Sequence, residues 1–213
     1  MPQPKVKNAA KTNGPARSNA ARPLDLTITA ATGKRFVPFL RKHLKAAHVQ
    51  LRPALSELSL ALVGDAHMSK LHQQFMNIAG PTDVLTFPLE FDDRGREIAG
   101  EVVICVDEAA RQAKRRGTPV ERELLLYALH GMLHLSGFDD RTDPDFRRMH
   151  RTEDQILVRL GLGPVFKGGN GNPASAGATR KPANAGNPTR NAGKSPRKAR
   201  TNGRNPAVRS LGA

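Results

Sequence analysis

The sequence predicts a mixed α/β domain of the α+β kind, with a small four-stranded mixed sheet, about five helices and disordered basic extensions at both ends. Apolar residues recur with strand and helix periods between residues 24 and 163, and a stretch of this length can bury one core. The charge is also divided along the chain. All 19 acidic residues lie between Asp25 and Asp154, so the formal net charge of +15 comes from the two ends.

The first half of this stretch predicts five elements. Leu24, Leu26 and Ile28 alternate with polar residues, as in a half-buried strand. The next apolar residues recur at helical spacing. Asp65 is a candidate cap for the second helix, because its side chain can accept from backbone N–H groups. The predicted spans are a strand at 24–30, a helix at 36–47, a strand at 55–63, a helix at 66–76 and a strand at 84–89.

The second half predicts a turn at 92–95, a fourth strand at 101–106 and three helices. The first of these helices covers 107–116. The second starts with Thr118 as its cap and Pro119 at its first position, and runs to Leu135, where Gly137 ends it in a left-handed turn. Asp143-Pro144 starts the last helix, and Gly161 ends it. Its predicted buried stripe is Phe146, Met149, Ile156, Leu157 and Leu160.

The two basic extensions cover residues 1–23, with five cations, and residues 164–213, with ten, and neither contains an anion. Few large apolar residues occur in them, so we expect both to be disordered. The longer extension is either a solubilising tail or a nonspecific anchor for polyanions, because cations near phosphates release counterions. The first extension is basic like a transit peptide, but its prolines and glycine disfavour an amphipathic helix.

Several classes of protein are disfavoured by composition. Cys105 is the single cysteine, which removes an intramolecular disulfide framework and suits a reducing compartment. No apolar run approaches the ~18 residues of a membrane helix, and no apolar segment resembles a secretory signal. We therefore expect a cytoplasmic protein with no membrane partner. Cys105 itself is expected to be a small core residue.

The candidate metal ligands lie in one short segment. His130 and His134 are four residues apart on one predicted helix, so their rings project from the same face. Helical histidines at this spacing bind zinc. Gly137 allows a sharp turn, after which Asp140 can supply a third ligand and leave a fourth position for water, as in catalytic zinc sites. Asp139 is one alternative third ligand, and Asp143 is another.

The remaining histidines have simpler interpretations. His150 is expected to be exposed or hydrogen-bonded, and the others are expected to be structural or on the surface: His43, His48, His67 and His72. Two histidines on an ordinary helix face are the alternative to a metal site. A zincin peptidase has a glutamate directly after its first histidine, where this chain has Gly131, so peptide hydrolysis would lack its general base.

Three segments together resemble the YbeY family of bacterial ribosomal RNA maturation endoribonucleases. The segment from His130 to Asp139, HGMLHLSGFD, matches that family's H-G-x-L-H-L-x-G-[FY]-D signature. Residues 81–88, PTDVLTFP, match its P-T-D-V-L-S-F-P stretch with one change, and residues 100–104, GEVVI, are similar to its G-D-[IV]-x-[IV] strand. The resemblance covers about residues 24–163, with the two extensions outside it.

The resemblance implies a small mixed sheet with helices and a zincin-like metal site. It implies one zinc ion per chain and no other cofactor, held by His130, His134 and Asp140. The implied activity is metal-dependent cleavage of single-stranded RNA in ribosomal RNA maturation, especially at the 16S 3′ end, and in ribosome quality control, with ribosomal RNA and ribosomal subunits as partners. The family's general acid and base cannot be assigned to residues here, so the catalytic residues are unknown.

Two positions depart from the family pattern. Its motif ends in a third histidine where this chain has Asp140, and an arginine implicated in RNA binding falls on Met76. An oxygen ligand can still bind zinc, but it favours harder metals. Met76 offers no charge, so Lys70, Arg94 or an extension residue would have to compensate. The alternative hypothesis is a noncatalytic ribosome-assembly or RNA-binding factor with a structural metal, and a metallopeptidase is a distant third.

Overall fold

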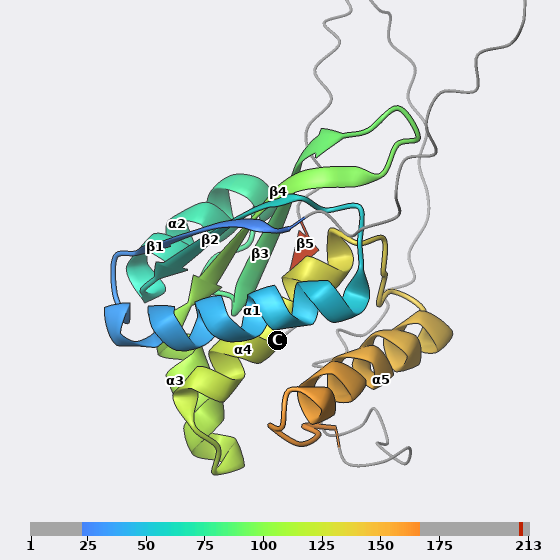
Figure 1. Ribbon diagram of the computed structural model, residues 1–213. Helices are drawn as coiled ribbons and strands as arrows, with labels where there is room; N and C mark the ends of the chain where they lie inside the picture. The colour runs from blue at the N-terminus through green and yellow to red at the C-terminus, as the bar shows by residue number, and fades with distance from the viewer. Residues whose placement is uncertain (1–22, 167–208, 211–213) are drawn as a thin grey trace, which may run out of the picture.

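A mixed sheet in the order β1-β2-β4-β3-β5 forms the centre of the computed structural model, which describes residues 23–166 and 209–210 (Figure 1). The first, second and fourth strands are parallel, and β3 runs antiparallel to β4. The predicted mixed four-stranded sheet is confirmed, and the two-residue β5, which the sequence did not predict, pairs with β3. The strands are β1 (Asp25–Ala30), β2 (Glu57–Val63), β3 (Val84–Phe91), β4 (Glu97–Cys105) and β5 (Arg209–Ser210).

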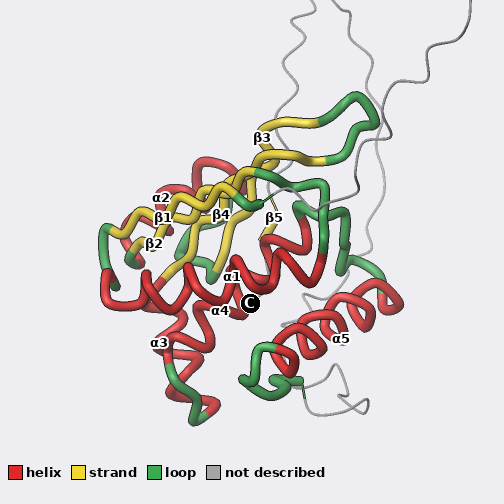
Figure 2. Tube along the Cα trace, viewed as in Figure 1, coloured by secondary structure: helices red, strands yellow, loops and turns green. Residues whose placement is uncertain are grey.

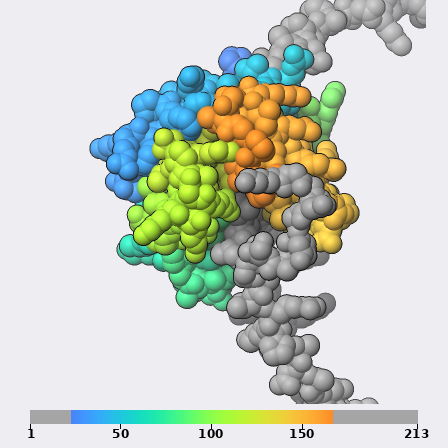
Figure 3. All heavy atoms as spheres, turned by 90° about the horizontal axis from the view of Figure 1, so that it is seen from below, coloured from blue at the N-terminus to red at the C-terminus, as the bar shows by residue number. Residues whose placement is uncertain are grey.

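Within the described residues, five α-helices surround the sheet, as predicted. In Figures 1 and 2, α1 and α4 lie on one face of the sheet and α2 lies on the other, while α5 packs on α4. Seen from the helical side in Figure 3, α1, α3 and α5 form blue, green and orange areas of the surface. The helices are α1 (Val37–Leu51), which follows a 3-10 turn at Lys34–Phe36, α2 (Asp65–Met76), α3 (Val106–Arg116), α4 (Val120–His134) and α5 (Asp143–Arg159).

The two faces of the sheet carry separate apolar clusters. Along β4, Val102 and Ile104 belong to the larger cluster beneath α1 and α4, whereas Val103 and Cys105 belong to the smaller cluster beneath α2. This alternation follows from the two-residue period of a strand. Met68 of α2 is fully buried in the smaller cluster. The prediction that Cys105 is a small core residue is confirmed.

The start of α2 differs from the prediction by one residue. Gly64, not Asp65, is the N-cap, and Asp65 is the first helical residue. The Asp65 carboxylate has a stronger partner elsewhere, because the guanidinium of Arg111 donates to its two oxygens at 2.7 Å each. A bidentate ion pair with α3 has therefore replaced a local capping bond.

The cap of α4 differs from the prediction by one residue in the other direction. Pro119, not Thr118, is the N-cap of α4, and the Thr118 hydroxyl donates to the buried Glu123 carboxylate at 3.0 Å. Helix α5 begins at Asp143, as predicted, and the Thr142 side chain caps it by accepting from the Asp145 N–H. The predicted ends are correct, since Gly137 and Gly161 both have positive φ angles.

The buried stripe of α5 is confirmed except at its first residue. Met149, Ile156 and Leu157 are at most 3% exposed, and Leu160 is partly buried against the larger cluster. Phe146 was predicted to be buried and is 45% exposed. It lies in the first turn of the helix, where its ring and the His150 ring meet in a T-shaped arrangement at a centroid distance of 4.0 Å.

The structured part of the chain continues past the predicted boundary at residue 163. Val165 and Phe166 pack against the larger cluster, and their N–H groups donate to one oxygen of Asp154 at 2.7 and 3.1 Å. The other predicted extension residues, apart from residues 23, 164, 209 and 210, lie outside the described residues.

Within the described part of the chain, no helix combines the length and the apolar character needed to cross a membrane.

The close approach of α4 to the sheet depends on glycine. A Cβ atom at Gly131 would lie 2.8 and 2.9 Å from the two Cγ atoms of Val102 and 3.0 Å from the Thr86 hydroxyl oxygen. On the opposite side of the contact, a Cβ atom at Gly100 of β4 would lie 2.5 Å from a methyl group of Leu135. The backbone of the second half of α4 therefore packs directly against side chains of β3 and β4, with no side chain of its own between them at Gly131.

Replacing Gly131 with alanine should destabilise the fold. Alanine favours a helix by about 1 kcal/mol over glycine, but its methyl group would force the branched side chain of Val102 to move, and overpacking costs about 1–3 kcal/mol. We expect a net decrease in the free energy of unfolding, measured by urea denaturation of the metal-free chain. In the double variant Gly131→Ala/Val102→Ala, the two decreases should be less than additive. A Gly131→Ala chain as stable as the parent would contradict this packing argument.

Candidate metal centre

The candidate metal centre lies inside the protein because α4 is surrounded on all sides. Every residue from Glu123 to His134 is buried, which is the behaviour of a helix that is apolar around its circumference. The exposed fractions of His130 and His134 are 1% and 2%. Buried polar rings need partners, so the surroundings of both histidines decide whether they are a metal site or two histidines on an ordinary helix face.

The chain after α4 turns back toward the two histidines. Gly137 has φ = 85°, a left-handed conformation that glycine adopts without strain. The Phe138 N–H donates to the carbonyl of Leu133 at 3.0 Å, which closes the end of the helix. This turn places Asp140 beside His130 and His134, as the sequence predicted.

The side-chain atoms of these three residues converge on one point. Nε2 of His130 lies 3.6 Å from Oδ2 of Asp140, and Nε2 of His134 lies 3.9 Å from Oδ1. The ligand atoms of His130, His134 and Asp140 all lie within 4.8 Å of one another. Tetrahedral zinc with bonds of about 2.0–2.1 Å requires neighbouring ligand atoms about 3.3 Å apart. Small side-chain movements would therefore complete a site.

The nitrogen that faces this point supports the same interpretation. Nε2 of His130 is buried and makes no hydrogen bond, which is costly for a polar atom unless a ligand is bound. Imidazole nitrogens with a carboxylate oxygen form a donor set that suits zinc, although the oxygen also accommodates harder metals. The residues present thus fit a divalent metal ion.

The other ring nitrogens of the site histidines contact protein oxygens. Nδ1 of His134 lies 3.1 Å from the carbonyl of Phe138. Nδ1 of His130 lies 2.8 Å from Oε1 of Glu153, and Nδ1 of His150 lies 2.6 Å from Oε2 of the same carboxylate. His150 is thus buried and hydrogen-bonded, which was one of its two expected states.

Sequence reasoning missed Glu153. A signal was available, because Glu153 falls midway between Met149 and Leu157 on the buried stripe of α5 and is itself fully buried. Burial acts to raise the pKa of its carboxyl group, but the hydrogen bonds from His130 and His150 outweigh burial and leave the pKa below its ordinary value. Glu153 is therefore ionised at neutral pH.

The alternative third ligands are placed elsewhere. The Asp139 carboxylate accepts from Nε of Arg141 at 2.7 Å, and this pairing lowers its pKa. Asp143 is exposed at the start of α5. Neither carboxylate belongs to the group of converging ligand atoms from His130, His134 and Asp140.

Three of the remaining histidines have structural partners. Nδ1 of His43 contacts the carbonyl of Phe39 at 2.8 Å, and Nε2 of His48 contacts the carbonyl of Leu55 at 2.6 Å. Nδ1 of His72 contacts the carbonyl of Gly80 at 2.9 Å, close to the residues that precede β3. The fourth, His67, lines a groove beside α2.

A second cluster of possible ligands has other partners. Asp65, Cys105 and Asp107 also bring ligand atoms within 4.8 Å of one another. However, the Asp65 carboxylate is paired with Arg111, and Asp107 accepts from the Asp65 N–H at 2.9 Å. Burial raises the pKa of the Cys105 thiol to about 12, so the sulfur stays protonated at neutral pH, whereas metal binding needs a thiolate.

Asp83 is a further carboxyl group near the histidines. Its carboxyl oxygen accepts from the Val84 N–H at 2.8 Å and from the Thr82 hydroxyl at 3.0 Å. Burial raises the pKa of Asp83 to about 6, although these hydrogen bonds act to lower it. A carboxyl group with this pKa can exchange a proton near neutral pH. The sequence singled out the segment that contains Asp83, but not the residue.

Position 131 cannot carry the base of a peptidase. A side chain there would meet Val102 and Thr86 of the sheet, so it would not lie in the space between His130 and Asp140. The absence of glutamate from this position follows from helix packing.

A groove with a volume of about 420 Å³ lies beneath α2, whereas the histidines belong to α4 on the opposite face of the sheet. Met76 is partly buried against the smaller apolar cluster on this same side. The lining residues are Ala61, Val63, His67, Leu71, Phe75, Phe87, Leu89, Glu101 and Val103.

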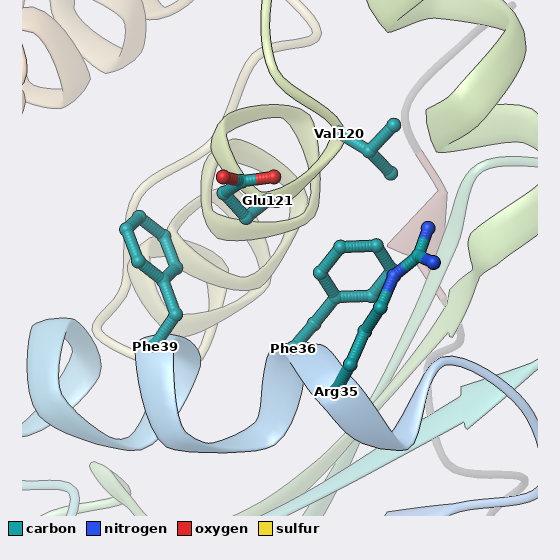
Figure 4. Close-up of a pocket in the computed structure, with 5 residues that line it drawn as sticks. All are labelled: Arg35, Phe36, Phe39, Val120 and Glu121. Carbon is teal, nitrogen blue, oxygen red and sulfur yellow. The ribbon is translucent and has the colours of Figure 1, made fainter.

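A second hollow, of about 360 Å³, lies at the first turn of α4, far along the helix from His130. Figure 4 shows it between the start of α1 and the start of α4. The Arg35 guanidinium lies 4.7 Å from the centre of the Phe36 ring, so this cation already contacts an aromatic face. The lining residues are Arg35, Phe36, Phe39, Val120 and Glu121.

Comparison with known proteins identifies relatives across the described domain. Proteins described as endoribonuclease YbeY from Desulfitobacterium hafniense and a Nocardioides species are 35% and 32% identical, over 55% and 66% of this chain and 80% and 93% of theirs. One from Rhodococcus opacus is 38% identical over 52% of this chain and 66% of its own length. A solution structure from Thermotoga maritima superposes with a TM-score of 0.47 at 26% identity, covering 69% of this chain and 99% of that chain.

The family model described as endoribonuclease YbeY matches residues 26–161. This range includes the whole of α4, the turn at Gly137 and Asp140. It also includes the segment that starts β3 and the helix that carries Glu153. The match extends over well over half of the chain, and with the curated relatives it shows that the chain belongs to the YbeY endoribonuclease family.

Proposed function

We propose that this chain is a metal-dependent endoribonuclease specific for single-stranded RNA. It acts in ribosomal RNA maturation, at the 3′ end of 16S ribosomal RNA, and in ribosome quality control, in the cytoplasm. The observation that supports this proposal is the convergence of His130, His134 and Asp140 within a chain of the YbeY endoribonuclease family. Ribosomal RNA and ribosomal subunits are the proposed partners.

The three converging residues would hold one zinc ion. A bound zinc ion supplies Lewis acidity toward a phosphate and lowers the pKa of water. The protein's part is to keep the ligands oriented and the site largely closed to solvent, and Asp140, at 19% exposure of its side chain, is the ligand nearest the surface. Asp83, with its raised pKa, is available to carry a proton close to His130.

The competing function is that of a noncatalytic RNA-binding or assembly factor with a structural metal. The uncharged Met76 favours it, because the family has an arginine at this position. The two functions are separated by incubating single-stranded and duplex RNA of the same sequence with the purified chain, with and without EDTA. Cleavage of the single strand that EDTA abolishes and zinc restores would support the nuclease. Binding without cleavage would support the assembly factor.

Metal content should depend on all three candidate ligands. His130→Ala and His134→Ala should each lose the metal in elemental analysis of the purified chain, because two ligands rarely hold zinc. Asp140→Ala should lower occupancy, whereas Asp140→His should tighten zinc binding, since neutral imidazole is a good zinc donor.

Asp139→Ala is the matched control, because it removes a neighbouring carboxylate that is paired with Arg141. Its metal content should equal that of the parent chain. Full occupancy in Asp140→Ala would remove Asp140 from the set of ligands.

Arginine at position 76 should increase RNA cleavage. The Met76 side chain is only partly buried, so the aliphatic part of arginine can cover the same apolar cluster while its guanidinium reaches water. We expect Met76→Arg to change the free energy of unfolding by less than about 1 kcal/mol and to raise the rate of single-strand cleavage.

Met76→Leu keeps the apolar contact without charge and should leave cleavage unchanged. Met76→Lys adds a positive charge without the planar donor group of arginine, so comparing it with Met76→Arg separates these two effects. A less stable Met76→Arg chain with no gain in cleavage would show that Met76 serves packing only, and would strengthen the assembly-factor hypothesis.

The second basic extension should contribute to RNA affinity and little to stability, because β5, its strand in the sheet, has only two residues. A chain ending at Phe166 keeps the packing of Val165 and Phe166 against the core and lacks ten cations. Its thermal unfolding should be nearly unchanged. Its affinity for single-stranded RNA should fall less steeply with salt, and the log–log slope should decrease by about 0.7 for each phosphate that the shorter chain no longer neutralises. An unchanged salt dependence would show that residues 167–213 do not bind RNA.

A further inference from the structure

The strongest unexplained feature near the metal centre is a buried carboxylate on α5. Glu153 is fully buried on the helix face that packs toward α4. Placing an ionised carboxylate among apolar neighbours such as Met149 and Leu157 is costly unless hydrogen bonds compensate. Both oxygens of Glu153 do have partners, at 2.8 Å to His130 and 2.6 Å to His150. Apolar side chains of α5, among them Met149, Ile156 and Leu157, also pack against the core.

The chemistry of a carboxylate fixes the protonation of both rings. An ionised carboxylate can only accept hydrogen bonds, so Nδ1 of His130 and Nδ1 of His150 must each carry a proton. A neutral His130 with its proton on Nδ1 presents the lone pair of Nε2. That nitrogen is the one that lies 3.6 Å from Oδ2 of Asp140, within the candidate metal site.

His150 restrains the carboxylate from its other side. The His150 ring contacts two aromatic rings, with centroid distances of 4.0 Å to Phe146 and 4.0 Å to Phe166. The ring is 8% exposed. Because His150 is held by these contacts, its bond to Oε2 restricts rotation of the Glu153 carboxylate and keeps Oε1 directed at His130.

We infer that Glu153 is a positioning residue for the metal centre, which selects the His130 tautomer able to bind metal, and that His150 positions Glu153 in turn. This inference rests on the proposed metal-dependent function. It assigns a role to α5, which supplies none of the three converging side chains, and it explains why a carboxylate occupies a buried position on that helix. Histidine ligands commonly donate their second N–H to a carboxylate, and removal of such a partner lowers metal affinity about 10–100-fold.

The substitution Glu153→Gln tests this role with little change in shape. A glutamine has one accepting oxygen and one donating amide group, so it can accept from only one of the two histidines. The other histidine must then carry its proton on Nε2. Whenever that histidine is His130, its Nε2 cannot bind a metal, so both tautomers of His130 should be populated.

The experiment measures tautomer and metal affinity separately. In the metal-free chain at neutral pH, ¹⁵N NMR of the imidazole rings should show His130 with its proton on Nδ1 in the parent and a tautomer mixture in Glu153→Gln. Zinc affinity, measured by competition with a chromophoric chelator, should fall about 10–100-fold in Glu153→Gln. His150→Phe, which keeps the aromatic stack but removes the bond to Oε2, should cause a smaller fall.

Ile156→Ala is the matched control, because it removes buried volume from the same helix without a hydrogen bond to His130. It should lower thermal stability and leave both readouts unchanged. Unchanged zinc affinity and an unchanged His130 tautomer in Glu153→Gln would overturn the inference. If Glu153→Gln does not fold, the His130 tautomer and the zinc affinity are measured in His150→Phe instead. The inference would be overturned if both were the same in His150→Phe as in the parent chain. The NMR readout needs neither RNA nor metal, so failure of the proposed nuclease activity would be seen separately as absence of cleavage by the parent chain.

Discussion

The structure depends on the contact between the second half of α4 and the sheet. Gly131 brings the helix backbone against Val102 and Thr86, and the helix is then enclosed on every side. Because of this contact, His130 and His134 are buried in the interior, where their polar ring nitrogens need hydrogen-bond partners or a ligand. The turn at Gly137 brings the Phe138 carbonyl to His134, and the docking of α5 brings Glu153 to His130. The loop and the last helix thus provide the hydrogen-bond partners that the two buried rings need.

The charges around the site form a balanced arrangement. Two carboxylates flank His130, one from Glu153 at 2.8 Å and one from Asp140 at 3.6 Å. With neutral imidazoles, two carboxylates compensate the charge of one divalent cation, which reduces the cost of placing that cation in a low-dielectric interior. In the family pattern, a histidine in place of Asp140 would leave one carboxylate and a net positive site. Asp140 therefore changes the electrostatics of the centre more than its coordination.

Sequence patterns predicted the strands, the helices and the grouping of His130, His134 and Asp140, because these depend on local periodicity and on one glycine turn. The helix caps at Asp65 and Thr118 were wrong because their side chains find partners in tertiary structure, namely Arg111 and Glu123. Glu153 lies 23 residues from His130 along the chain, and no local pattern indicates that contact. The predicted spans of strands and helices could not show that α4 and the groove beneath α2 lie on opposite faces of the sheet.

The Phe166 ring contacts the His150 ring at a centroid distance of 4.0 Å, and His150 is joined through Glu153 to His130. Phe166 therefore lies at the end of a series of side-chain contacts that begins at a candidate metal ligand. A substitution at position 166 would act on the candidate site through His150 and Glu153, so the last residues of the described domain are coupled to that site.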